Sequence, residues 1–229
     1  MSEQVQQMFS AIAPRYDLAN GVLSLGTHQL WRRFAVKASH AAPGSKVLDC
    51  ATGTGDLALA FKRTVGASGR VVGTDFCAEM LELAPPKAAA AGLEIEFAQA
   101  DAQHLPYGDD LFDVASIAFG IRNVDDPVKC LREMARVVRP GGRVVVLEFG
   151  QPRGVFGALF RIYSTYVLPF VGGLISGKRA AYQYLDRTAA AFPSGDGFTG
   201  LMKKAGAFSD IRDQSLTFGT VHVYTGVVA

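Results

Sequence analysis

Short apolar runs alternate with stretches of helical spacing along the first two thirds of the chain. The runs at residues 47–50, 70–75, 95–98, 112–119 and 143–149 are short and apolar enough to be buried strands. Helical patterns separate them, beginning with Leu57, Ala58 and Phe61 after the first run. Because parallel strands need crossover helices, this alternation predicts a doubly wound α/β sheet with helices on both faces.

Two of the intervening helices carry proline signals. Residues 78–91 are rich in Ala, Leu, Glu and Met and predict one helix, weakened by Pro85 and Pro86. A later helix starts at Asp126, an N-cap followed by proline, and its apolar positions run at helical spacing as far as Val138. The sequence Pro140-Gly141-Gly142 is expected to end it.

The C-terminal part of the chain has a different pattern. Residues 198–205 look helical, whereas residues 211–216 and 221–228 predict two strands joined by a turn at Gly219. We therefore expect a mostly parallel seven-stranded sheet that ends in an antiparallel hairpin.

The chain contains no internal repeat or linker, so we interpret residues 1–229 as a single domain. Residues 1–45 are expected to form an N-terminal helical cover, and residues 150–196 an insert that covers the ligand crevice. Within the insert, residues 154–177 are long and apolar enough to cross a bilayer. Arg161, Pro169 and the pair Gly172-Gly173 favour broken, buried helical pieces instead of a membrane span.

Composition narrows the function classes. With 49% hydrophobic and 19% charged residues, the 229-residue chain can bury one sizeable core. A net charge of only +2 argues against a nucleic-acid partner. Cys50, Cys77 and Cys130 form no CxxC pair, which favours a reducing, cytoplasmic setting and no metal site. The first nine residues do not resemble an export signal.

A glycine-rich loop follows the first predicted strand. Residues 49–58 read DCATGTGDLA, in which Gly53 and Gly55 allow a ligand to lie against the backbone at a helix N-terminus. The same letters also satisfy the dinucleotide pattern GxGxx(G/A), and a tight packing turn would look similar. The loop alone therefore does not identify the ligand.

Three carboxylates at the same sheet edge distinguish between the candidate ligands. Asp49, Asp75 and Asp101 each stand at or just beyond the end of a predicted strand. Together they would repel the pyrophosphate of NAD, whereas S-adenosylmethionine carries a sulfonium and an ammonium. Asp75 is placed for the ribose hydroxyls, Asp101 with Ala102 for the adenine edge, and Asp49 for the ammonium. A solvated strand end or a helix cap is the alternative for each aspartate.

Longer motifs along nearly the whole chain are more specific than the glycine loop. They are Met8-Phe9-Ser10, Tyr16-Asp17, Asn20, Leu30-Trp31-Arg32-Arg33, Phe119-Gly120-Ile121-Arg122-Asn123-Val124, Arg139-Pro140-Gly141-Gly142, Leu147-Glu148-Phe149 and Tyr182-Gln183-Tyr184-Leu185. The glycine loop with Asp75 and Asp101 is similar to the cofactor motifs of class I methyltransferases in general. The longer motifs resemble those of the ubiquinone/menaquinone-biosynthesis C-methyltransferase family, and most closely its demethylmenaquinone-methylating members. This resemblance implies a Rossmann-like class I methyltransferase fold.

The resemblance also implies an activity and a set of contacts. The reaction would move a methyl group from S-adenosylmethionine to a ring carbon of a reduced polyprenyl quinol, converting demethylmenaquinol to menaquinol. Thr54, Asp75 and the Asp101–Ala102 pair would bind the cofactor, with Tyr16 near its amino-acid end. The family pattern has Ser where this chain has Ala118, so a hydroxyl contact is missing here.

A ring carbon becomes nucleophilic when the adjacent hydroxyl loses its proton or is strongly polarised. Arg122 and Asn123 follow the fourth strand and are expected to donate hydrogen bonds to the developing phenolate, unless they only cap neighbouring backbone. His104 is a candidate general base because histidine titrates near neutrality, although a loop histidine is often merely exposed. His28, His40 and His222 have weaker claims.

A tailed quinol resides in a bilayer, so we expect peripheral contact of residues 154–177 with the inner face of the membrane. Arg153, Arg161, Lys178 and Arg179 would support that contact, and the sequence leaves a homodimer open. Aromatic side chains of the insert could line a site for the isoprenoid tail or simply pack a core: Tyr163, Tyr166, Phe170, Tyr182 and Tyr184.

Three other functions stay open at this point. A related methyltransferase could act on another small acceptor, such as a benzoquinol, a sterol or a phenol. An NAD-dependent oxidoreductase is allowed by the glycine loop and Asp75 but disfavoured by Asp49 and Asp101. A cofactor-binding protein without an acceptor site is the third.

Overall fold

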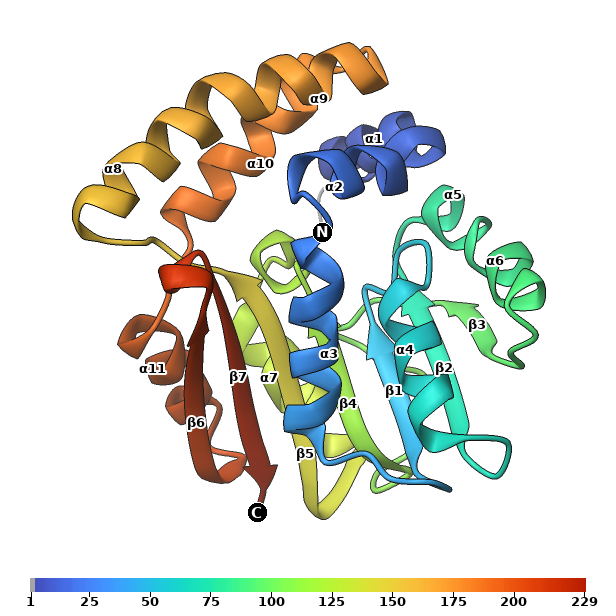
Figure 1. Cartoon of the computed structure of the whole chain (residues 1–229). Helices are drawn as coiled ribbons and strands as arrows, with labels where there is room; N and C mark the ends of the chain where they lie inside the picture. The colour runs from blue at the N-terminus through green and yellow to red at the C-terminus, as the bar shows by residue number, and fades with distance from the viewer. Residues whose placement is uncertain (1–2) are drawn as a thin grey trace.

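The computed structural model describes residues 3–229 and builds them around one seven-stranded sheet (Figure 1). Strands β1 to β5 are parallel, and β7 runs antiparallel to both β5 and β6, in the order β3-β2-β1-β4-β5-β7-β6. The predicted sheet with its closing hairpin is therefore confirmed. The strands are β1 (Lys46–Cys50), β2 (Arg70–Asp75), β3 (Glu96–Gln99), β4 (Phe112–Ala118), β5 (Val138–Phe149), β6 (Phe208–Leu216) and β7 (Val221–Val228).

Helices cover both faces of the sheet, which explains why the central strands β1 and β4 and the second half of β5 are buried along almost their whole length. On one face, α3 (Thr27–Ser39) and α4 (Asp56–Val65) pack on residues such as Val47. On the other face, α7 (Pro127–Arg136) and α11 (Asp196–Ala205) pack on residues such as Leu48. Successive strand residues thus belong to opposite cores.

The helix predicted over residues 78–91 is two helices, α5 (Ala78–Leu81) and α6 (Ala84–Ala90). Pro85 and Pro86 lack the N–H that a continuing helix needs, and they occupy the first turn of α6 instead. The expectation of a single helix was therefore wrong.

Two other element boundaries differ from the prediction. Val138 does not belong to α7, which ends at Arg136, but begins β5 and pairs with Phe112. The predicted N-cap at Asp126 is confirmed, because its carboxylate accepts from Val128 N and Lys129 N at 2.9 and 3.0 Å. Strand β6 starts at Phe208, three residues before the predicted start.

Two groups of helices lie over the carboxyl edge of the parallel strands (Figure 1). The first comprises α1 (Glu3–Ile12), the 3-10 turn η1 (Ala13–Arg15) and α2 (Tyr16–Leu23), whereas α3 packs on the sheet itself. The second comprises α8 (Gly154–Ile162), the π turn η3 (Tyr163–Val167), α9 (Leu168–Ser176) and α10 (Arg179–Ala191). Short 3-10 turns η2 (Ile121–Asn123) and η4 (Thr217–Gly219) complete the chain. Residues 1–2 of the predicted cover lie outside the described residues.

The expectation of broken, buried pieces over residues 154–177 was wrong. Residues Gly154–Ser176 form one continuous helix with a mean hydropathy of 1.4, and only 11% of its most apolar window is buried. Pro169 does not break it, because the wide π turn η3 comes directly before and Pro169 sits in the first turn of α9. By length and composition alone this helix could cross a membrane, a test that core helices of globular proteins also pass.

Candidate active site

A cavity of about 450 Å³ lies between the carboxyl edge of the sheet and the two groups of covering helices. Its floor comes from the segments after β1, β4 and β5, where the strand order reverses and ligands of α/β proteins usually bind. Its roof comes from α2, α8, η3 and α10. Apolar side chains form much of the wall, including Leu23, Trp31, Phe119, Phe149, Phe160, Leu168 and Leu185.

Asp49 is a buried carboxylate at the end of β1 that lines this cavity. It accepts hydrogen bonds of 2.7 Å from Thr52 Oγ1 and from Ser116 Oγ. Burial raises the pKa of Asp49 to about 6, and the two hydroxyl donors only partly oppose that shift. A cation beside Asp49 would stabilise the ionised form.

The glycine loop folds back onto Asp75 at the end of β2. Gly53 N donates to Asp75 Oδ2 at 2.7 Å, and Cys77 N donates to Oδ1 at 2.8 Å. Burial nevertheless raises the pKa of Asp75. Gly55 has φ +84°, and a Cβ there would lie 3.0 Å from Ala84 Cβ, so this position requires glycine. The predicted strand–loop–helix geometry is thus present.

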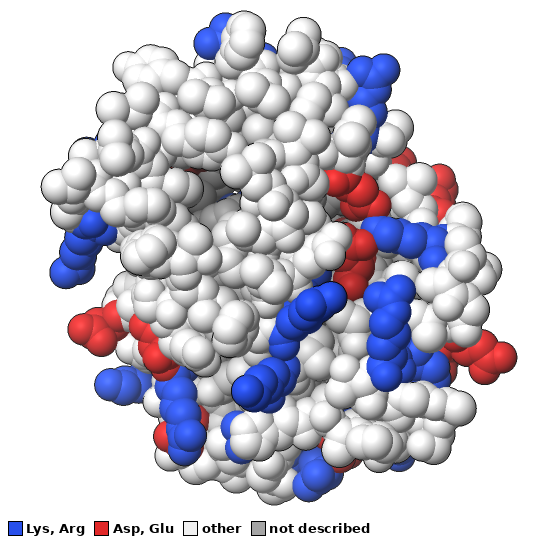
Figure 2. Space-filling model, in the orientation of Figure 1, with Lys and Arg blue, Asp and Glu red and all other residues white. Residues whose placement is uncertain are grey.

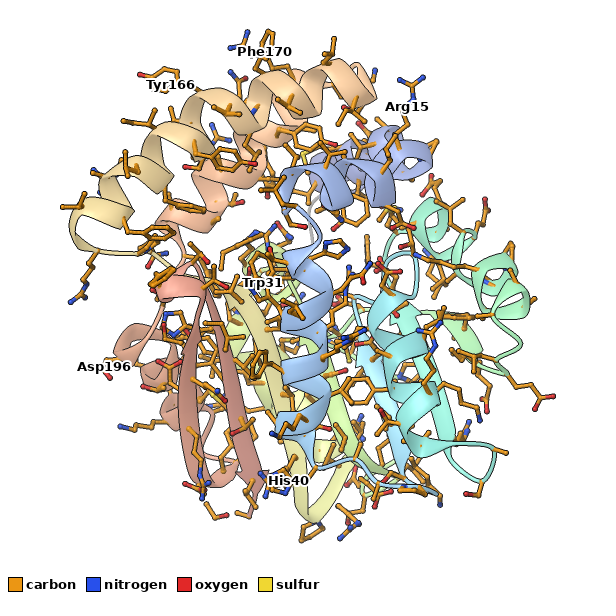
Figure 3. All side chains as sticks on the ribbon, viewed as in Figure 1. Arg15, Trp31, His40, Tyr166, Phe170 and Asp196 are labelled. Atoms are coloured by element: carbon orange, nitrogen blue, oxygen red, sulfur yellow. The ribbon has the colours of Figure 1, made fainter. Side chains whose placement is uncertain are left out.

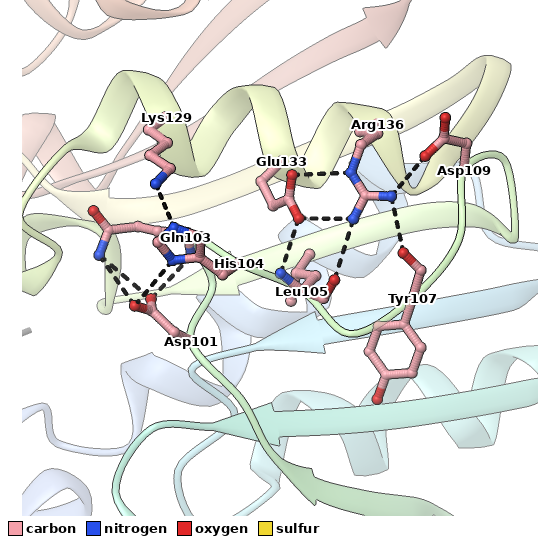
Figure 4. Close-up of polar contacts among 9 residues, drawn as sticks. All are labelled: Asp101, Gln103, His104, Leu105, Tyr107, Asp109, Lys129, Glu133 and Arg136. Carbon is pink, nitrogen blue, oxygen red and sulfur yellow. Dashed lines mark hydrogen bonds and ion pairs between the residues drawn. The ribbon is translucent and has the colours of Figure 1, made fainter.

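Asp101 and Ala102 follow β3 and lie outside the cavity described above. Asp101 Oδ1 accepts from Gln103 N at 2.9 Å, which fixes the carboxylate at the start of a tight turn (Figure 4). His104 is on the same turn, with 68% of its side chain exposed and Lys129 Nζ 2.5 Å from its Nε2. The structure therefore places His104 on the surface, away from the cavity.

Thr54 belongs to a network of charged side chains that sequence reasoning missed. Its Oγ1 donates to Asp17 Oδ1 at 2.6 Å, and Lys87 Nζ donates to it at 3.2 Å. Lys87 also pairs with Asp17 and with Asp56, and Asp56 pairs with Arg32 Nη1 at 2.8 Å. These contacts fasten α2, α3 and α6 to the glycine loop. Arg32 and Asp56 stood in recognised motifs, but nothing in the sequence indicated Lys87.

Arg122 lines the cavity from η2, but part of its guanidinium is already bound. Nη1 donates to Phe119 O at 2.6 Å and to Glu148 Oε1 at 2.7 Å, and the guanidinium lies over the Phe149 ring. Burial raises the pKa of Glu148, against the attraction of Arg122. Asn123 does not line the cavity, and its Oδ1 accepts from Tyr184 OH at 3.4 Å.

The cavity brings together only some of the predicted site residues. Tyr16, Asp49, Gly53, Thr54 and Arg122 line it, whereas Gly55, Asp75, Asp101, Ala102 and Asn123 lie beside or beyond it. Of the insert aromatics, Tyr163 and Tyr182 line the cavity, while Tyr166 and Phe170 point away from it (Figure 3). His28, which had a weaker claim than His104, lines the cavity. Within residues 3–229, no group of three or more His, Cys, Asp or Glu side chains could hold a metal ion.

Two relatives of similar sequence match this chain over almost their entire length. This chain is 57% identical to the ubiquinone/menaquinone biosynthesis C-methyltransferase UbiE of Bdellovibrio bacteriovorus over 227 residues, covering 99% of this chain and 96% of that protein. It is 51% identical to the demethylmenaquinone methyltransferase of Thermus thermophilus over 221 residues, covering 96% of this chain and 99% of that protein.

Solved structures with low sequence identity share the fold. A possible histamine N-methyltransferase of Thermotoga maritima, described as SAM-dependent, has a TM-score of 0.68 at 20% identity, covering 97% of this chain and 99% of that one. A Haemonchus contortus phosphoethanolamine N-methyltransferase, solved with S-adenosylhomocysteine, has a TM-score of 0.66 at 16% identity, covering 92% of this chain and 56% of that one. The model of the ubiE/COQ5 methyltransferase family matches residues 1–228, which confirms the resemblance of the motifs: the chain belongs to this family.

Proposed function

We propose that this protein transfers a methyl group from S-adenosylmethionine to a ring carbon of a reduced polyprenyl quinol, converting demethylmenaquinol to menaquinol. The observation that carries the proposal is the cavity, which joins the glycine loop and Asp49 to a wall of aromatic and aliphatic side chains. The names of the two relatives above, at 57% and 51% identity, support this reaction.

The chemistry of the glycine-loop edge fits S-adenosylmethionine. Asp49 is buried with its pKa raised to about 6, and each of its oxygens accepts from one hydroxyl, so lone pairs remain for an ammonium group. The backbone of Gly53 and Gly55 has positive φ and carries no side chain at the approach to the loop. A pyrophosphate would instead meet uncompensated carboxylates, which disfavours NAD.

We assign the cofactor contacts by the position of each residue along this edge. Asp49 and Tyr16 would hold the amino-acid end, Asp75 the ribose, and Asp101 with Ala102 the adenine edge. Thr54 would act through the loop, because its hydroxyl is bonded to Asp17. When bound, S-adenosylmethionine supplies a methyl group that is electrophilic without further activation.

On the acceptor side, the protein must exclude water and stabilise negative charge on the ring oxygen. We assign the stabilising role to Arg122, which lines the cavity and whose guanidinium presents a planar fork of N–H donors. Asn123 would act indirectly, by holding Tyr184 of α10 in place. Ala118 also lines the cavity, where a serine would offer a hydroxyl.

We propose that the outer side of the α8–α9 helix rests on a membrane surface, so that the isoprenoid tail can reach the cavity from the bilayer. The helix has two sides: Phe160, Tyr163 and Leu168 line the cavity, whereas Leu159, Ile162, Tyr166, Phe170 and Leu174 are exposed. Figure 2 shows this region as a largely uncharged band above a hollow.

A helix that borders a cavity on one side suits the interface better than a bilayer span. Arg153, Arg161, Lys178 and Arg179 are exposed near this helix and would attract anionic lipids. The protein would then be cytoplasmic and peripheral at the inner face of the membrane. The homodimer that the sequence leaves open stays a prediction.

The test of the proposed reaction is transfer of labelled methyl from S-adenosylmethionine to chemically reduced demethylmenaquinone, with the oxidised quinone as control. We expect label on a ring carbon only with the reduced acceptor, because the oxidised ring has no hydroxyl to deprotonate. Label on a benzoquinol, a sterol or a phenol, with none on the naphthoquinol, would favour the alternative acceptors. Tight cofactor binding without transfer to any acceptor would contradict the proposal.

A further inference from the structure

His28 is a buried histidine near the start of α3 that lines the cavity, and the proposed function above gives it no role. Its Nδ1 lies 2.5 Å from Ser24 Oγ, and Ser24 Oγ in turn donates to Asn20 O at 2.6 Å. A serine hydroxyl has one proton, so Ser24 accepts from His28 and the histidine proton is on Nδ1. The lone pair of the neutral ring is then on Nε2.

The Nε2 atom has no partner among the described residues and is not one of their fully enclosed polar atoms. Because the residue lines the cavity, Nε2 is available to a molecule bound there. Proteins prepare a histidine to accept a proton in this way: a neighbouring acceptor binds the Nδ1 proton, and the Nε2 lone pair stays open.

The surroundings keep the ring neutral. Burial lowers the pKa of His28, with Arg32 as the next cause. Lys87 acts in the same direction, whereas Asp56 and Asp17 act against it, so two cations and two anions face the ring from α2, α3, α4 and α6. The N-terminal end of α3 also disfavours a positive imidazole. His28 is therefore in the form that can take up a proton at neutral pH.

We propose that His28 is the general base of the reaction, with Nε2 accepting the hydroxyl proton of the quinol. This inference rests on the proposed function. The proton moves from the hydroxyl oxygen to Nε2, the ring carbon forms a bond to the methyl carbon, and the sulfur keeps the electron pair of the broken bond. The ring carbon then loses its hydrogen as a proton to water, and the imidazolium returns its proton to the ring oxygen. One proton is released overall.

The other titratable side chains of the cavity are less suited to this role. Asp56 is ion-paired with Arg32 and with Lys87, which lowers its pKa. Tyr163 OH donates to Leu23 O at 2.7 Å, and burial raises its pKa. Asp49 is bonded to two hydroxyls at the cofactor end. Asp186, on α10, is the remaining carboxylate of the wall and is the rival to be tested.

The first test compares His28→Asn with the wild type in pH profiles of kcat/KM on reduced demethylmenaquinone. Asparagine keeps a donor for Ser24 but has no basic lone pair. We expect a loss on the order of 10²–10⁴-fold near pH 7.5 and disappearance of the decline below about pH 6.5. His40→Asn is the matched control, because His40 caps the other end of the same helix, at the edge of the sheet away from the covering helices (Figure 3), and has φ +56°, which asparagine tolerates.

The second test uses acceptors whose hydroxyl is made more acidic by ring fluorination. A general base matters less when the proton is easily lost, so the deficit of His28→Asn should shrink at least tenfold on them. An equal deficit on all acceptors, with an unchanged pH profile, would overturn the inference. So would loss of the acid limb in Asp186→Asn alone. Wild-type inactivity on every reduced quinol would instead contradict the proposed function.

A readout independent of turnover is the ¹⁵N spectrum of the His28 ring in the cofactor-free protein. We expect the Nδ1–H tautomer and a titration midpoint below the 6.5 of an ordinary histidine, with unchanged cofactor affinity in His28→Asn. An Nε2–H tautomer would overturn the assignment, because Nε2 would then have no lone pair to offer.

Discussion

Arg122 Nη1 lies 2.7 Å from Glu148 Oε1, and the two side chains are only 3% and 1% exposed. The same Nη1 donates to Phe119 O, so the pair joins the end of β5 to the segment after β4. Arg122 Nε and Glu148 Oε2 are buried without a hydrogen-bond partner among the described residues. The pair therefore holds the cavity wall in place at a cost in desolvation.

Replacing one partner of this ion pair should destabilise the protein more than replacing both. Arg122→Met leaves Glu148 buried without a cation, and Glu148→Leu leaves Arg122 buried without an anion, so each should cost about 3–5 kcal/mol in urea unfolding. The double variant, Arg122→Met with Glu148→Leu, should recover most of that loss because no unpaired charge remains.

The rate of methyl transfer distinguishes two roles of Arg122, support of the cavity wall and stabilisation of charge on the ring oxygen. The double variant should stay impaired by at least tenfold in kcat, since it has no guanidinium for the ring oxygen. Full activity in a stable double variant would show that Arg122 only supports the wall.

The stability of the cofactor-free protein should depend on pH through Asp49. Its pKa is about 6 when folded and about 4 in an unfolded chain, so between these values the folded state binds the extra proton. This contribution to stability is complete below about pH 4 and is lost as the pH rises through 6. Asp49→Asn removes this pH dependence because its side chain is neutral at every pH, and it should raise the free energy of unfolding by up to about 3 kcal/mol at pH 7.5 and by little at pH 4.

The affinity for the cofactor should change with pH in the opposite direction to the stability. The wild type should bind S-adenosylmethionine more weakly as the pH falls through 6, and calorimetry should find at least tenfold weaker binding in Asp49→Asn at pH 7.5. An Asp49→Asn protein that is no more stable at pH 7.5, or that binds as the wild type does, would contradict this role.

Alanine should be far less tolerated at Gly55 than at Gly206, although both glycines are left-handed caps of helices, Gly55 of α4 and Gly206 of α11. Both have positive φ, +84° and +68°, with ψ of 8° and 17°, which costs alanine about 1–2 kcal/mol at either position. Only at Gly55 would the new Cβ meet neighbours, 3.0 Å from Ala84 Cβ and 3.3 Å from Leu59 Cδ1. We expect Gly55→Ala to lose a further 1–3 kcal/mol, roughly the cost of overpacking, and to weaken cofactor binding. Equal thermal unfolding of the two variants would refute the packing argument.

The strands were predictable because buried parallel strands leave continuous apolar runs, and Asp49 and Asp75 were placed by standing where those runs end. Charged contacts between distant segments were not. Lys87 and Asp17 are 70 positions apart, and no periodicity links them. The same holds for Trp31 Nε1, which donates to Thr217 Oγ1 at 2.8 Å from the far end of the chain.

The insert was misread for a local reason. Pro169 and Gly172 ordinarily interrupt helices, but η3 widens the turn before Pro169, and Gly172 packs against the Tyr182 ring, where a Cβ would approach within 2.6 Å. Glycine is thus required for α9 to lie close to α10. His28 was undervalued because its significance depends on Ser24 and on a cavity wall that only the fold creates.

Membrane contact should depend on the outward apolar side chains of the α8–α9 helix. Phe170 and Leu174 are 62% and 77% exposed and make no part of the cavity wall, so a double change to serine should leave cofactor binding and folding intact. Each removed side chain contributes about 1.5–3 kcal/mol when buried in an apolar phase. Sedimentation with vesicles containing anionic lipid should therefore fall at least tenfold for the double variant. Leu111→Ser, at an exposed leucine before β4, is the control and should sediment as the wild type does. Equal sedimentation of all three proteins would rule out this helix as the membrane-binding surface, because the apolar area lost in the double variant would then not affect binding. No sedimentation of the wild type with substrate present would rule it out as well.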